Sequence, residues 1–137
     1  MRKSFDRSID SIAAVYEFTE SVLVSGDIGE PLRFPVHLAM EELFVNMVRY
    51  YPDNDDAIQL DVDIDDGVVK VTMTDFNVDP FDVTQSSNVD INAPLDERTP
   101  GGLGLHLIQN MVDNLEYAYE GRQSTIKFTK GDGKENV

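Results

Sequence analysis

Apolar residues recur every three to four positions in three segments of this chain, which is the period of a helix with one buried face. In the first segment the pattern runs from Ile12 through Val15 to Leu23, and Ser8 before it is a residue type that caps helix starts. Pro52 and the polar turn after it end the second segment. The pattern predicts helices over about residues 9–24, 35–50 and 103–113.

Elsewhere apolar and polar residues alternate strictly, which is the period of a strand with one buried face. Between residues 58 and 64, aliphatic residues alternate with Gln59, Asp61 and Asp63. The pair Asp66-Gly67 follows, and it is typical of the two-residue turn of a hairpin. We expect strands, the first of them a short edge strand, over about residues 2–6, 58–64, 69–75, 115–119 and 126–128.

This order of elements predicts an α+β fold. Tight turns join consecutive strands, so we expect a mostly antiparallel mixed sheet that helices cover on one face, as a two-layer sandwich. The length of 137 residues and the hydrophobic fraction of 41% suit one domain with a core. We expect this domain over residues 1–130 and a flexible tail over residues 131–137.

Charge and composition narrow the classes of function. The net charge of −15 disfavours direct binding to nucleic acid or to an anionic membrane. Either it favours a basic protein partner, or it serves solubility alone. The chain has no cysteine, which excludes disulfides and thiolate metal sites and favours an intracellular setting. The N-terminal residues show neither a secretion signal nor a transmembrane span, so we expect a cytoplasmic protein.

A glycine-rich segment stands directly before the third predicted helix. Gly101, Gly102 and Gly104 come at the end of a long polar stretch over about residues 76–100. Glycine lets the backbone approach a ligand closely, and a helix start offers unpaired N–H groups, so together they can seat a phosphate. The alternative is a tight loop that binds no ligand.

Several polar side chains occur where apolar residues surround them. Glu42 and Asn46 lie four residues apart, on one face of the otherwise apolar second helix. Either they satisfy each other and the nearby backbone, or they face a wet cavity. Arg49 lies one turn further on, within reach of a phosphate or of solvent. Asp75 ends an apolar strand, where it can accept a hydrogen bond from an exocyclic amine or cap a turn.

In this order, the features resemble the GHKL ATP-binding fold, also called the Bergerat fold. Within it they are most similar to the anti-sigma-factor serine/threonine kinases, which pair a glutamate with an asparagine four residues later, as Glu42 and Asn46 are paired. Pro80-Phe81-Asp82 and the stretch 97–105 resemble further motifs of that branch, and so does the stretch 113–117.

The resemblance implies a protein kinase that uses ATP and Mg²⁺. It implies that Asn46 coordinates Mg²⁺, that Asp75 binds the adenine amine, and that Glu42 is the base toward a serine or threonine hydroxyl. It also implies nucleotide contacts from Arg49, Asn77, Arg98, Thr99, Gly101, Gly102, Leu103 and Gly104. The implied partners are a sigma factor and the small anti-sigma-factor antagonist that the kinase phosphorylates, and the implied oligomer is a homodimer.

The stretch after Asp75 departs from the family pattern, because the next five residues contain no glycine. Asn77 can adopt the left-handed backbone that glycine would supply, but its side chain and that of Phe76 narrow the adenine pocket. The alternative function is therefore a non-catalytic regulator with weak or lost nucleotide binding. The catalytic half of a sensor histidine kinase is disfavoured, because His37 and His106 both fall inside predicted helical segments.

Overall fold

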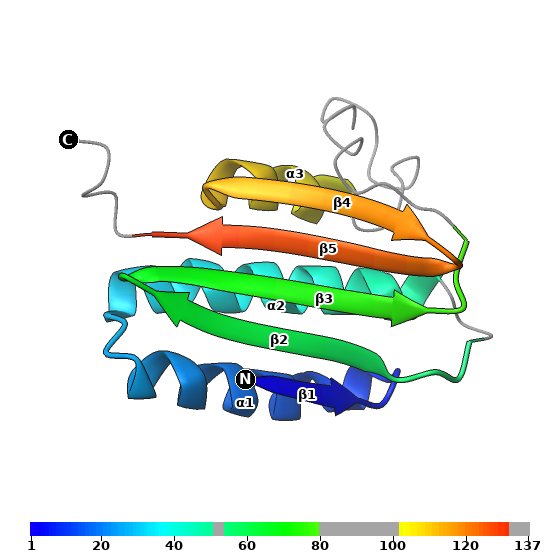
Figure 1. The fold of residues 1–137 in the computed structure, drawn as a ribbon, viewed down its shortest axis with the longest axis horizontal. Coiled ribbons are helices and arrows are strands. Elements are labelled where there is room, and N and C mark those ends of the chain that lie inside the picture. Colours follow the sequence, from blue (N-terminus) through cyan, green and yellow to red (C-terminus); the bar gives the residue numbers. More distant parts are fainter. Residues whose placement is uncertain (51–53, 80–101, 132–137) are drawn as a thin grey trace.

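A five-stranded sheet carries helices on one face in the computed structural model, which describes residues 1–50, 54–79 and 102–131 (Figure 1). The strands are β1 (Arg2–Phe5), β2 (Ile58–Asp65), β3 (Val68–Phe76), β4 (Asn114–Glu120) and β5 (Gln123–Lys130). The helices are the short 3-10 helix η1 (Ile9–Ser11), α1 (Ile12–Ser25), α2 (Glu30–Tyr50) and α3 (Gly102–Met111). The expected two-layer α+β sandwich is confirmed.

The sheet order is β1-β2-β3-β5-β4, and every pairing between described strands is antiparallel. β3 ends at Phe76, opposite Gln123, whereas β4 starts near the other end of β5, with Asn114 opposite Thr129. Because α3 ends just before β4 starts, its own start lies toward the end of the sheet where β3 ends (Figure 1). The last turn of α2 lies at this same end (Figure 1), so the fold brings the three predicted motifs toward one end of the sheet.

The core lies between the sheet and the helices, because the inward positions of the strands are aliphatic. Leu60, Met73 and Ile126 face one another across β2, β3 and β5, and each is at most 3% exposed. Phe44 and Leu43 of α2 are fully buried against this layer. Burying one such side chain stabilises the fold by about 1.5–3 kcal/mol, so the alternation in the sequence decides which face of each strand meets the helices.

The first helix begins as predicted, with Ser8 as its cap. The Ser8 hydroxyl oxygen accepts a hydrogen bond of 3.1 Å from the Asp10 amide. The first turn is the 3-10 helix η1, and α1 follows from Ile12. The cap therefore satisfies one of the amides that a helix start leaves unpaired.

The second helix begins earlier than predicted, at Glu30 rather than at residue 35, so that Pro35 lies inside it. The amides of Leu32 and Arg33 both donate to the Gly29 carbonyl at 3.1 Å, which nucleates the helix one turn before that proline. Pro31 lies in the first turn, where the amides have no intrahelical acceptor. Pro35 lies beyond that turn, so the helix loses the hydrogen bond that an amide at this position would donate to the Pro31 carbonyl. Although α2 has 21 residues, no helix in the described part of the chain has the length and apolar composition needed to cross a lipid bilayer.

Both hairpins turn through residues with left-handed backbone. Asp66 and Gly67 have φ values of 53° and 77°, which confirms the predicted two-residue turn. Gly121 and Arg122 have φ values of 60° and 61° in the turn between β4 and β5. Most of the polar stretch over 76–100, and the tail from residue 132, lie outside the described residues.

Candidate functional site

Asp75 lies near the end of β3, and its carboxylate is only 1% exposed. It lies on the same face of the strand as Met73, and this face packs against the helices. The Arg7 guanidinium, with a side chain that is 3% exposed, donates to both carboxylate oxygens. Nη2 bonds Oδ1, and Nη1 lies 3.5 Å from Oδ2. The strand-end acid is therefore half of a buried ion pair.

Arg7 also binds two backbone carbonyls at this end of the sheet. Its Nη1 donates to the Met47 carbonyl of α2 at 2.9 Å, and its Nε donates to the Asp56 carbonyl before β2 at 3.1 Å. One side chain thus joins the end of α2, the start of β2 and the end of β3. Hydrogen bonds in which one partner is charged are roughly twice as strong as neutral ones. The bonds of Arg7 therefore hold these three segments together.

Asn46 is 4% exposed and adjoins Met47 in α2. Its Nδ2 donates to the main-chain carbonyl of Glu42 at 2.7 Å, so the amide bonds the backbone of the glutamate. Its Oδ1 is buried and has no hydrogen-bonding partner among the described residues. Buried polar atoms are nearly always paired, so this unpaired oxygen is the candidate contact for a ligand atom.

A carboxamide oxygen of this kind suits Mg²⁺, which prefers oxygen ligands and keeps several waters. In the described ranges no group of three or more histidine, aspartate and glutamate side chains is arranged to hold a metal ion. Among the described residues, the Asn46 Oδ1 atom could serve as one such ligand. The remaining ligands would come from phosphate oxygens and water, the usual situation for Mg²⁺ on a nucleotide.

The chain after Asp75 turns without glycine, because Asn77 adopts the left-handed conformation with φ of 58°. The Asn77 side-chain amide bonds the Asp56 carboxylate. The Asn54 side-chain amide donates to the Phe76 carbonyl at 2.7 Å, and the Tyr119 hydroxyl donates to the Val78 carbonyl at 2.7 Å. The expectation for the Asn77 backbone is confirmed, and its side chain serves to hold this turn.

The remaining predicted residues are placed less completely. Glu42 is half-buried in α2, and Arg49 is exposed near the end of that helix. The backbone of Gly102, Leu103 and Gly104 forms the first turn of α3, which packs against α2. Arg98, Thr99 and Gly101 lie outside the described residues.

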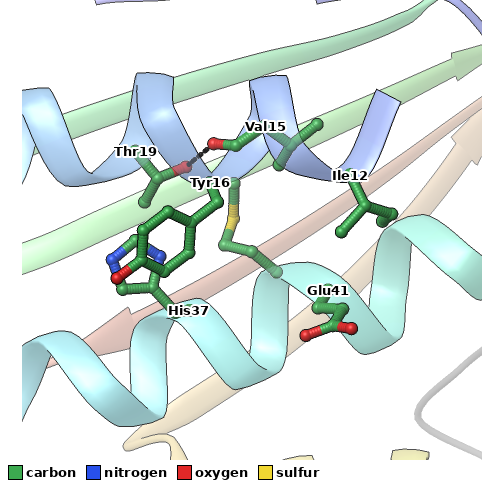
Figure 2. A pocket seen from close by; sticks show the side chains of 7 residues that line it. Ile12, Val15, Tyr16, Thr19, His37 and Glu41 are labelled. Atoms are coloured by element: carbon green, nitrogen blue, oxygen red, sulfur yellow. Dashed lines mark hydrogen bonds between the residues drawn. The ribbon is translucent and has the colours of Figure 1, made fainter. Parts of the chain in front are cut away.

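A groove lies between α1 and α2 (Figure 2), and neither Arg7, Asn46 nor Asp75 lines it. Tyr16 stacks on the His37 ring at a centroid distance of 4.0 Å, and His37 Nε2 lies 2.9 Å from Glu20 Oε1. The volume of about 30 Å³ has room for roughly one water molecule. The groove is too small for a nucleotide, and His37 is a packing residue within α2.

Arg7 is the site residue that the sequence pattern did not reveal. It stands between the end of β1 and the Ser8 cap, where a charged residue is ordinarily solvated. Its ion-pair partner is 68 positions away in the chain. Neither helical nor strand periodicity carries a signal over that distance, so only the tertiary structure identifies the pair.

Comparisons with known proteins agree with this architecture. The sequence profile of the histidine kinase-like ATPase domain matches residues 5–130. A chain in the crystal structure of the SiaB–SiaC complex from Pseudomonas aeruginosa is similar in structure, with a TM-score of 0.70 and 15% sequence identity, covering 94% of this chain and 88% of that chain. At this identity the likeness concerns the fold. No curated protein matches the chain.

Proposed function

Because the chain belongs to the histidine kinase-like ATPase family, we propose that it binds Mg²⁺–ATP where α2, β3 and α3 meet and phosphorylates a serine or threonine of a small partner protein. The observation that carries this proposal is the buried Asn46 Oδ1, which lacks a partner in the described part of the chain. An unpaired buried acceptor costs about 1–3 kcal/mol. A ligand atom bound there would pair the Asn46 oxygen and offset that cost.

The other residues take roles that fit their places. Asp75 accepts the exocyclic amine of adenine, and Glu42, half-buried one turn before Asn46, accepts the proton of the substrate hydroxyl. Bound Mg²⁺ neutralises charge on the phosphates. Arg49 and the glycine segment that starts α3 add positive charge and backbone amides around the phosphates. Phosphoryl transfer depends mainly on such positioning and electrostatics.

The proposal includes a partner switch with two protein partners. One is the small antagonist that receives the phosphoryl group, and the other is a sigma factor. Two observations support this part: the structural neighbour occurs in a complex of the proteins SiaB and SiaC, and the net charge of −15 suits a basic partner surface.

The test compares two adjacent glutamates. The purified protein is incubated with Mg²⁺ and γ-labelled ATP together with a soluble extract of the cells that carry the gene, and phosphorylated residues are identified by mass spectrometry. We expect Glu42→Gln to abolish labelling of a small protein on serine or threonine. Glu41→Gln is the matched control, because Glu41 is exposed and the change in charge is the same. Equal labelling by both variants would remove Glu42 from the catalytic role.

The buried Arg7–Asp75 pair favours a second candidate function, a non-catalytic regulator on the same fold. In that case the guanidinium permanently replaces the base of a nucleotide, and the chain acts only through protein contacts. Calorimetry separates the two candidates: the kinase binds Mg²⁺–ATP and loses affinity in Asn46→Ala, whereas the regulator gives no heat at about 1 mM nucleotide.

A further inference from the structure

The carboxylate that the proposed function assigns to adenine is held by a side chain of the same protein. Arg7 donates to both oxygens of Asp75, and both side chains are at most 3% exposed. A carboxylate has further lone pairs, but at 1% exposure no incoming group reaches them. An adenine amine therefore replaces the guanidinium instead of binding beside it.

We infer that Arg7 is an internal competitor of the nucleotide, so that the base subsite opens only when residues 6–11 leave their present position. This inference rests on the proposed function, because it takes Asp75 as the acceptor of the adenine amine. It makes the N-terminal segment between β1 and α1 the element that sets nucleotide affinity.

The contacts of residues 6–11 show why this segment can be displaced and loosened when Arg7 leaves Asp75. Apart from the bonds of the Arg7 side chain, the hydrogen bonds of this segment are local: the Ser8 amide and the Ser11 hydroxyl both donate to the Asp6 carbonyl, at 2.8 and 2.9 Å. Between the buried residues Phe5 and Val15, every residue is half-buried or exposed as a whole. The buried Arg7 side chain is thus the contact that holds the segment against the rest of the fold.

The strength of this anchor sets the size of the effect. Leaving one partner of a buried ion pair without the other lowers the equilibrium constant for folding by about two to four orders of magnitude. Part of this is regained when the guanidinium returns to water and the amine binds Asp75. We therefore expect the intact pair to weaken Mg²⁺–ATP binding at least tenfold relative to a chain without the guanidinium.

The experiment measures Mg²⁺–ATP affinity by calorimetry in the full chain. Arg7→Ala should tighten binding at least tenfold. Arg2→Ala is the matched control, because Arg2 is 66% exposed and its removal changes the net charge equally, and it should change affinity less than twofold. Arg7→Lys covers the case in which Arg7→Ala does not fold: an ammonium group has three donors and cannot make the bonds of Arg7 to both Asp75 oxygens and both carbonyls, so it should tighten binding at least threefold.

Hydrogen exchange of the wild-type chain supplies a readout that does not depend on variants. Saturating Mg²⁺–ATP should speed exchange of the amides of residues 8–11 at least threefold. If nucleotide binds but Arg7→Ala and Arg7→Lys bind no more tightly than wild type, or exchange in this segment slows, the competitor role is wrong and the proposed function stands. If no variant binds at about 1 mM nucleotide, both proposals fail.

Discussion

Replacing Arg7 by alanine should destabilise the fold strongly, because it leaves Asp75 charged, 1% exposed and without its guanidinium. It also removes the donors to the Met47 and Asp56 carbonyls. Removing one partner of a buried pair costs about 3–5 kcal/mol. That is a large share of the roughly 5–15 kcal/mol that stabilises a domain. With a urea m-value near 2 kcal/mol/M, the unfolding midpoint should fall by about 2 M.

Asp75→Asn should cost less, about 1–3 kcal/mol. The variant keeps an acceptor oxygen at the same place, and Arg7 keeps its two backbone carbonyls. In the double variant the loss should be smaller than the sum of the single losses, with a coupling energy of about 1–3 kcal/mol.

Urea unfolding followed by circular dichroism measures all three variants, with Arg2→Ala as the control. Arg2 forms an exposed pair with Asp61 at 3.3 Å, and such pairs contribute about 0–1 kcal/mol. If Arg7→Ala lowers the free energy of unfolding no more than Arg2→Ala, or if the losses at Arg7 and Asp75 simply add, the pair does not stabilise this end of the sheet.

Three further outcomes follow from the same contacts. Asn46→Leu should abolish Mg²⁺–ATP binding in calorimetry yet change the free energy of unfolding by less than about 1 kcal/mol, because it removes an unpaired acceptor together with one hydrogen bond; a loss of several kcal/mol would make Asn46 structural. Asn77→Ala should be less stable than Asn77→Gly by about 1 kcal/mol in urea unfolding, since both lose the side-chain bond and only alanine resists a φ of 58°; equal stability would contradict the left-handed turn. The hydrogen bond between the Met1 amine and Asp63 raises the pKa of the amine above 8.0 and lowers the pKa of the carboxyl below 3.8. Their contribution to stability should therefore be complete between pH 3.8 and pH 8.0, and it should be lost as the pH rises through the amine pKa or falls through the carboxyl pKa. When stability is measured against pH, this dependence should be smaller in Asp63→Asn, which keeps the Met1 contact with Asp61 at 3.5 Å.

Local sequence was sufficient to predict most elements of this fold. Ser8 caps the first helix and Asp66-Gly67 turns the first hairpin because each depends on neighbours a few residues away. The alternation along residues 58–64 predicts the buried face of β2 for the same reason. The start of α2 was predicted too late, because proline is typical of the first turn of a helix, whereas in this helix the first amides bond the Gly29 carbonyl and Pro35 lies further along.

The candidate site was predicted only in part. The sequence indicated the spacing of Glu42 and Asn46 and the strand-end position of Asp75, but it left open which atoms pair. The structure shows that the Asn46 amide bonds a backbone carbonyl and leaves its oxygen buried and unpaired. It also shows that Asp75 is held by Arg7. The roles of these residues in binding nucleotide stay predictions.

The sequence alone determined the kind and order of the elements, since periodicity and turn chemistry are interactions between near neighbours. Only the tertiary structure decided that β5 lies between β3 and β4 and that Arg7 meets Asp75. Those contacts join residues far apart in the chain. The two charges are paired in the native fold because an arrangement that buries one of them without the other is several kcal/mol less stable.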